Sequence, residues 1–154
     1  MIDAKDSKDT FYILNKKQNT PVVLIHGVGL NHKIWEPQID SFNNTVLAYD
    51  ILGHGNTRLT KSQISLDDFS LQLLNLIDEL KFEKIHLVGF SIGSLIARNF
   101  ASNYNNRLES LTLLCSVFQR AKNNNKQLMI DLNYLKKADL YQKKLLKDGL
   151  QIVI

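Results

Sequence analysis

Five short apolar runs recur along the chain and predict β-strands. Each run is too short to form a helix, and most are rich in the β-branched residues that buried strands favour. The runs are Phe11–Leu14, Pro21–Ile25, Thr45–Tyr49, Lys84–Val88 and Leu111–Cys115. Three of them end directly before His26, Asp50 and Gly89, so polar or glycine-rich loops are expected at these strand ends.

Helical periodicity fills the intervals between these runs. Apolar residues recur three and four positions apart from Leu66 to Leu80, and Ser65 is a suitable N-cap in front of two aspartates. A second apolar stripe extends from Ile92 to Tyr104, and a shorter helix is expected over residues 33–42. Strands that alternate with helices predict an α/β fold with a mainly parallel sheet, right-handed crossovers and helices on both faces.

The last part of the chain differs in charge. Residues 126–148 predict one or two further helices, with Gly149 as a helix stop, and residues 151–154 predict a short strand. Residues 119–154 contain eight Lys or Arg against three Asp, a net charge of +5, whereas residues 1–118 carry −1. Because the lysines are interleaved with Leu and Tyr and no base-reading motif accompanies them, they are interpreted as a solvated helix face, with no nucleic-acid or membrane partner. An anionic contact is the alternative.

Composition places the chain among ordinary globular proteins. It has 154 residues, of which 44% are hydrophobic and 22% charged, consistent with one domain. This excludes a disordered tail, a collagen-like fibre and a disulfide scaffold. No stretch approaches the ~18 apolar residues of a membrane span, and the N-terminus lacks the apolar core of a signal peptide. The single cysteine, Cys115, is expected to be a small buried hydrophobic residue and favours a reducing, cytoplasmic location.

A G-x-S-x-G motif carries the candidate chemistry. Gly89-Phe90-Ser91-Ile92-Gly93 lies between a predicted buried strand and a predicted amphipathic helix, which is where a nucleophile elbow is found. The turn is so tight that the residues two before and two after the serine must be small, and Gly89 and Gly93 meet this condition. We expect the strained turn to expose the Ser91 hydroxyl above the sheet. The Ile92 N–H then lies at a helix N-terminus, facing a developing oxyanion.

Two further loops after predicted strands are rich in glycine. His26-Gly27-Val28-Gly29 has glycines that allow the loop to bend close to the serine, so the Val28 N–H is a candidate second oxyanion donor. Asp50-Ile51-Leu52-Gly53-His54-Gly55 follows the next strand. Asp50 is interpreted as a carboxylate that organises this loop, and the triad acid is the alternative role for it. The first loop only superficially matches a dinucleotide-binding motif, because the third glycine of G-x-G-x-x-G is replaced by His32.

Together these three motifs resemble those of α/β-hydrolase fold proteins in order and spacing. Over residues 11–118 the chain is similar to 3-oxoadipate enol-lactonase-like proteins and related small carboxylesterases. The resemblance implies Ser91 as nucleophile, the Val28 and Ile92 N–H groups as oxyanion hole, a small ester or lactone substrate, and no metal or organic cofactor. It also implies that residues 1–118 are the N-terminal part of the hydrolase core and that residues 119–154 begin a helical cap. Ser94 stands where glycine is common, a change that a first helical turn tolerates.

One departure from the family pattern is large. The family's catalytic acid and histidine lie downstream, after later strands, whereas no histidine follows Val117 here. A serine without its histidine is a poor nucleophile, and triad deletions in other hydrolases indicate a loss of ~10³–10⁶-fold. We therefore expect a serine hydrolase that is incomplete in this chain, as the N-terminal portion of an ordinary hydrolase; a shortened reading frame is equally open. The alternative is a non-catalytic protein of the same fold that binds a small molecule or a partner chain.

The histidines and the last predicted strand add two expectations. His26, His32 and His54 are expected to have structural or loop roles rather than to act as the base, and His86 to be a satisfied histidine within a strand. Without the later strands of the family, the run Leu111–Cys115 forms an exposed apolar edge. We therefore predict self-association at this edge unless another chain or the C-terminal segment covers it.

Overall fold

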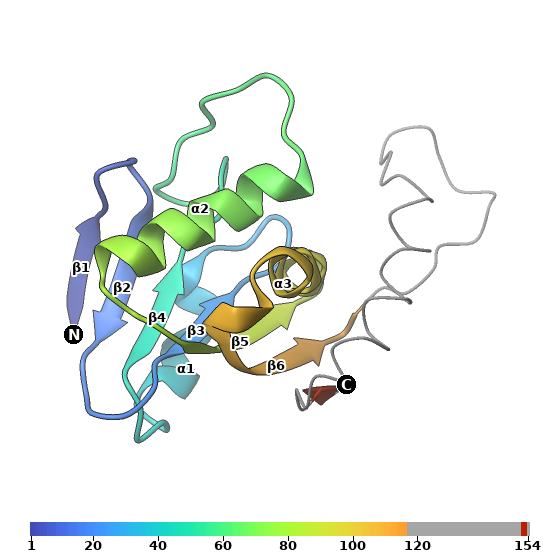
Figure 1. Cartoon of the computed structure of the whole chain (residues 1–154). Helices are drawn as coiled ribbons and strands as arrows, with labels where there is room; N and C mark the ends of the chain where they lie inside the picture. The colour runs from blue at the N-terminus through green and yellow to red at the C-terminus, as the bar shows by residue number, and fades with distance from the viewer. Residues whose placement is uncertain (117–151, 154) are drawn as a thin grey trace.

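A mostly parallel sheet forms the centre of the molecule (Figure 1). The computed structural model describes residues 1–116 and 152–153. Within these ranges the strands are β1 (Ile2–Lys5), β2 (Phe11–Asn15), β3 (Val22–Ile25), β4 (Val46–Tyr49), β5 (Ile85–Phe90), β6 (Leu108–Leu114) and β7 (Ile152–Val153). Their spatial order is β1-β2-β4-β3-β5-β6-β7. The pairs β1/β2 and β2/β4 are antiparallel and all other neighbours are parallel, so the predicted fold class is confirmed.

Helices cover both faces of this sheet. α2 (Leu66–Glu79) and α3 (Ile92–Asn103) pack against one face (Figure 1). The one-turn helix α1 (Glu36–Ile39), which continues the 3-10 turn His32–Trp35, packs against the other face. A second 3-10 turn, Asn105–Arg107, connects α3 to β6. The predicted two-sided arrangement is therefore present.

The central strand β3 shows how the sheet separates two cores. Val23 and Ile25 join the cluster under α2 and α3, whereas Val22 and Leu24 join the cluster under α1. All four are buried, because successive side chains of a strand point to opposite faces and both faces are covered here. A strand buried on both faces reads as a continuous apolar run, which is why the sequence predicted it.

Local sequence explains where the helices begin. Ser65 Oγ accepts a hydrogen bond from the Asp68 N–H at 3.3 Å, and the Asp68 carboxylate accepts one from the Ser65 N–H at 2.9 Å, so the predicted N-cap of α2 is a complete capping box. The single helix predicted over 33–42 is instead a 3-10 turn followed by α1. Pro37 in the first turn of α1 has no N–H to bond back to the preceding turn, so the α-helical hydrogen bonds start only there.

The edge strand β1 was not predicted from the sequence. It pairs with β2 from Ile2 opposite Leu14 to Lys5 opposite Phe11. Its side chains are mostly exposed, so it lacks the alternating apolar pattern that marks a half-buried strand. Pairing along β2, rather than burial, defines this strand.

The other sheet edge is covered over two residues by a strand from the end of the chain. Ile152 and Val153 form the short parallel strand β7 opposite Leu111 and Thr112 of β6. Within the strand predicted at residues 151–154, Ile152 and Val153 are thus a strand, and the C-terminal segment covers the edge at Leu111 and Thr112, one of the two kinds of covering expected. Self-association through the rest of this edge stays a prediction.

Cys115 differs from the expectation of a buried thiol. It is exposed and has a φ of 50°, because β6 ends at Leu114 and the chain leaves the sheet there. The helices predicted over 126–148, the stop at Gly149 and the cap predicted over 119–154 lie outside the described residues. In the part of the chain that is described, no helix is long and apolar enough to cross a membrane.

Candidate active site

Ser91 lies at the sharp turn between β5 and α3. Its φ of 55° and ψ of −116° fall in a region that is costly for a residue with a side chain and that persists only where the surroundings impose it. The side chain is half-buried, and its hydroxyl makes no hydrogen bond to any described residue. The strained turn predicted from G-x-S-x-G is therefore present. The Ser91 hydroxyl does not cap α3, because it makes no hydrogen bond to the first-turn N–H groups.

The two glycines of the motif are required by close backbone approaches. A Cβ on Gly93 would lie 2.5 Å from the carbonyl oxygen of Ile25 and 2.7 Å from that of His26. A Cβ on Gly89 would contact the Gly93 carbonyl group and lie 2.8 Å from the Cα of Ser94. The steric requirement inferred from the sequence is thus explained by two contacts, one inside the turn and one between α3 and the end of β3.

The two predicted oxyanion donors flank this turn in different elements. Ile92 is the first residue of α3, where an N–H has no partner within the helix, and this N–H donates to no described residue. Val28 lies in the loop after β3, is 65% exposed, and its N–H also has no acceptor among the described residues. In the same loop, Gly27 lies against the Phe90 ring, and a Cβ on Gly27 would lie 3.2 Å from that ring. Gly29, with a φ of 72°, lies in open space. Both amides are therefore available to a ligand, and their oxyanion role stays a prediction.

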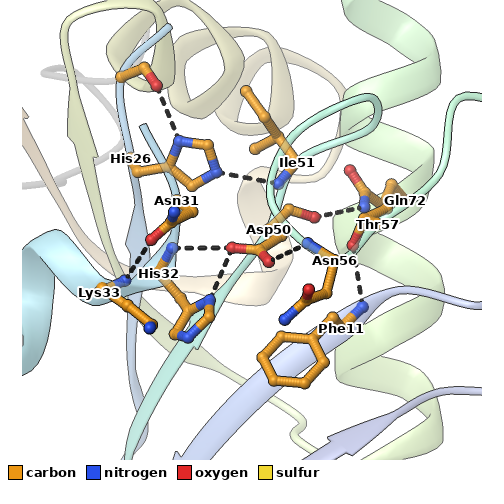
Figure 2. Close-up of polar contacts among 11 residues, drawn as sticks. Phe11, His26, Asn31, His32, Lys33, Asp50, Ile51, Asn56, Thr57 and Gln72 are labelled. Carbon is orange, nitrogen blue, oxygen red and sulfur yellow. Dashed lines mark hydrogen bonds and ion pairs between the residues drawn. The ribbon is translucent and has the colours of Figure 1, made fainter. Parts of the chain in front are cut away.

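His26 has the structural role expected from the sequence. The ring is buried, with Nδ1 2.8 Å from the Gly27 carbonyl oxygen and Nε2 3.1 Å from the Ile51 nitrogen (Figure 2). An Nδ1–H tautomer donates to Gly27 and accepts from the Ile51 N–H, so both ring nitrogens are occupied. Burial lowers the pKa of His26 below its ordinary value of 6.5, which favours this neutral form. The ring joins the β3 and β4 loops and is not free to act as a base.

Asp50 organises the neighbouring loops, as expected from the sequence. Its side chain is fully buried. One carboxylate oxygen accepts hydrogen bonds from the His32 N–H at 2.7 Å and from His32 Nδ1 at 2.8 Å, and the other accepts the Asn56 N–H at 2.7 Å (Figure 2). Gly55, with a φ of 53°, passes so close that a Cβ at this position would clash with the Asp50 carboxylate. This buried charge is compensated by three donors from two loops.

The remaining two histidines make local contacts. His54 Nδ1 lies 3.1 Å from the Leu52 carbonyl oxygen, and its ring packs 5.4 Å from that of His26. His86 Nδ1 lies 2.8 Å from Ser110 Oγ on the neighbouring strand. None of the four histidines hydrogen bonds to Ser91. Within the described ranges, no group of three or more His, Cys, Asp or Glu is arranged to hold a metal ion.

Gln72 is a structural member of this region that sequence reasoning missed. It is buried on α2, where its amide nitrogen donates to the Asp50 carbonyl at 3.0 Å (Figure 2). Its amide oxygen accepts the Leu52 N–H at 3.1 Å. The side chain thus attaches the loop after β4 to α2. A polar residue next to an apolar helical stripe was the available signal.

The chain is similar to known hydrolases over much of its length. The sequence profile described as alpha/beta hydrolase fold matches residues 20–145. The chain is 30% identical over 113 residues to (E)-2-((N-methylformamido)methylene)succinate hydrolase of Acinetobacter baylyi, covering 72% of this chain and 43% of that protein. It is 30% identical over 100 residues to 3-oxoadipate enol-lactonase 1 of the same organism, covering 63% of this chain and 37% of that protein.

A solved hydrolase structure is also similar to this chain. The meta-cleavage product hydrolase from Pseudomonas fluorescens is similar with a TM-score of 0.67 and 28% sequence identity, over 73% of this chain and 43% of that one. The chain therefore spans less than half the length of each of these three proteins.

Proposed function

This chain belongs to the alpha/beta hydrolase fold family, and on that premise we propose that it is the nucleophile-bearing part of a serine hydrolase acting on a small carboxylic ester or lactone. The observation that carries the proposal is the backbone of Ser91, with a φ of 55° at the start of α3 and a hydroxyl that bonds to no described residue. A serine used only as a helix cap would direct its oxygen to the first-turn N–H groups. Ser91 does not.

The chemistry proposed for this site is acyl transfer. Ser91 Oγ attacks the substrate carbonyl, the carbonyl oxygen becomes an oxyanion, and the free N–H groups of Val28 and Ile92 donate to it. Collapse of this intermediate breaks the ester C–O bond and leaves an acyl group on Ser91. The departing oxygen takes up the proton that Ser91 released, and the resulting alcohol leaves, or stays attached to the acyl group when the substrate is a lactone. Water then attacks the acyl carbonyl, releases the acid and restores the serine. One of the similar proteins is named as an enol-lactonase, which supports this substrate class.

The proton of Ser91 has no acceptor among the described histidines. All four use Nδ1 in contacts elsewhere, and His26 uses both ring nitrogens. We therefore propose that a histidine outside these 154 residues is needed for full turnover. The chain alone is expected to be acylated ~10³–10⁶-fold more slowly than a complete triad enzyme.

Labelling with a fluorophosphonate tests the nucleophile. The probe is expected to modify the folded chain at Ser91, located by mass spectrometry of the modified peptide, and Ser91→Ala should abolish this adduct. Ser102→Ala is the matched control, because Ser102 lies on the same α3 but bonds to the Arg98 carbonyl. Labelling that persists in Ser91→Ala would show that Ser91 is not the reactive residue.

The rival function is binding without catalysis by the same fold. It is favoured by one observation, the engagement of every histidine in structural contacts. Folded wild-type protein that shows no Ser91 adduct over long incubation, and no release of 4-nitrophenol from 4-nitrophenyl acetate above the Ser91→Ala rate, would favour this rival.

A further inference from the structure

Ser94 donates hydrogen bonds to the Ser91 carbonyl oxygen, at the turn between β5 and α3. The Ser94 side chain lies in a fully buried position. Its Oγ donates a hydrogen bond to the Ser91 carbonyl oxygen at 2.5 Å, and its backbone N–H donates to the same oxygen at 3.0 Å. The first turn of α3 therefore binds this carbonyl oxygen through a side-chain donor in addition to the backbone.

That carbonyl belongs to the peptide group whose nitrogen is Ile92. The peptide is trans and planar, so the C=O of Ser91 and the N–H of Ile92 point in opposite directions from one rigid unit. Fixing the direction of the carbonyl oxygen therefore fixes the direction of the Ile92 N–H. A donor on the oxygen also polarises the peptide, which makes its N–H a stronger donor to an acceptor on the other side.

We propose that Ser94 is a positioning residue that aims and polarises the Ile92 N–H for the oxyanion. This rests on the proposed function, in which Ile92 donates to the developing negative charge. Ser94 touches neither the substrate nor the reacting atoms, and it acts through the 91–92 peptide. A glycine at position 94 would keep the backbone donor but would lose the hydroxyl, so the side chain adds a second restraint to a turn that its neighbours already hold in a strained conformation.

Packing alone is the competing explanation for a buried serine. The Cα of Ser94 lies close to Gly89, since a Cβ on Gly89 would come within 2.8 Å of it. Substitutions at position 94 that separate volume from hydrogen bonding distinguish the two roles. Ser102 provides the matched control on the same helix, because its Oγ donates to the Arg98 carbonyl at 2.9 Å without contact to the turn.

The first experiment measures the rate of fluorophosphonate modification at Ser91 in the full chain. Ser94→Ala and Ser94→Cys should lower this rate by about three- to tenfold, the effect of losing one neutral hydrogen bond of ordinary strength. Ser94→Thr should retain most of the rate because it keeps the hydroxyl, and Ser102→Ala should leave it unchanged. A packing role predicts another order, in which Cys keeps the rate and the larger Thr loses it; that order would overturn the proposal. Thermal unfolding of each variant confirms that folded protein is compared.

The second experiment does not depend on reactivity. In ¹⁵N–¹H spectra, loss of the Ser94 hydroxyl bond should move the Ile92 amide nitrogen upfield in Ser94→Ala and Ser94→Cys, with restoration in Ser94→Thr and no change in Ser102→Ala. An Ile92 resonance that is the same in all variants would overturn the positioning role. If wild-type Ser91 is never labelled but Ile92 shifts as described, the hydrolase proposal fails while the arrangement of Ser94 and the 91–92 peptide is supported.

Discussion

The backbone N–H of Ser91 donates a hydrogen bond to the carbonyl oxygen of Leu114, 3.0 Å away. β5 and β6 pair in parallel with Phe90 opposite Leu114, so this bond extends the sheet ladder one residue beyond β5 and into the turn. The unusual backbone of Ser91 is therefore restrained on both sides, by β6 at its N–H and by Ser94 at its carbonyl. The candidate site thus depends on a strand that follows the motif by some twenty residues in the sequence, as well as on the motif itself.

The contact between α3 and β3 predicts a large difference between two glycines. Gly93→Ala should lower the free energy of unfolding by about 3 kcal/mol or more, because the new Cβ would meet the carbonyl oxygens of Ile25 and His26. Gly29→Ala is the control, since its φ is 72° but the space around it is open, and it should cost about 1 kcal/mol. Urea unfolding measures both. Equal losses in the two variants would contradict the close contact.

The buried Asp50 carboxylate predicts a strong effect of removing its charge. Asp50→Asn should lower the free energy of unfolding by about 2–4 kcal/mol, because its amide group cannot accept all three donors from His32 and Asn56. The control is Asp40→Asn, an exposed carboxylate that accepts one hydrogen bond from Asn15, for which a change within about 0.5 kcal/mol is expected. The prediction is wrong if guanidinium unfolding shows no difference between the variants.

The lowered pKa of His26 predicts a loss of stability on acidification. Burial disfavours the charged ring in the folded state, so the unfolded chain, with a pKa near 6.5, binds the proton more tightly. The contribution of neutral His26 is fully present above pH 6.5 and is lost as the pH falls below 6.5 toward the lower folded-state pKa. In His26→Gln, the drop in unfolding free energy between about pH 7.5 and about pH 5.5 should be smaller than in the wild type. An unchanged drop would assign the pH dependence to other groups.

The exposure of Cys115 predicts a reactive surface thiol. Cys115 is exposed after the end of β6, so 5,5′-dithiobis(2-nitrobenzoate) should modify it in the native protein at a rate within about tenfold of that in guanidinium, because accessibility governs such modification. Since the chain has one cysteine, the absorbance change reports this site alone. Modification that requires unfolding would contradict its position outside the core.

Much of the sheet could be predicted because the required information is local. Val22–Ile25 of β3 is buried on both faces and reads as a continuous apolar run, and Ser65 with Asp68 marks the start of α2 within four residues. β1 could not be predicted, because its exposed side chains leave no apolar period. Its position follows only from pairing with β2.

The sequence by itself determined the α/β class, the tight turn at Ser91 and the need for glycine at positions 89 and 93, because periodicity and sterics act between near neighbours. Only the tertiary structure decided that His32 bonds to Asp50, that Leu114 binds the Ser91 N–H and that Cys115 faces solvent. These relationships depend on the order of strands in the sheet and on where each strand ends. The physical reason is that a hydrogen bond requires two groups within about 3 Å, and for residues distant in the chain that distance is set by the fold and not by the spacing of the residues.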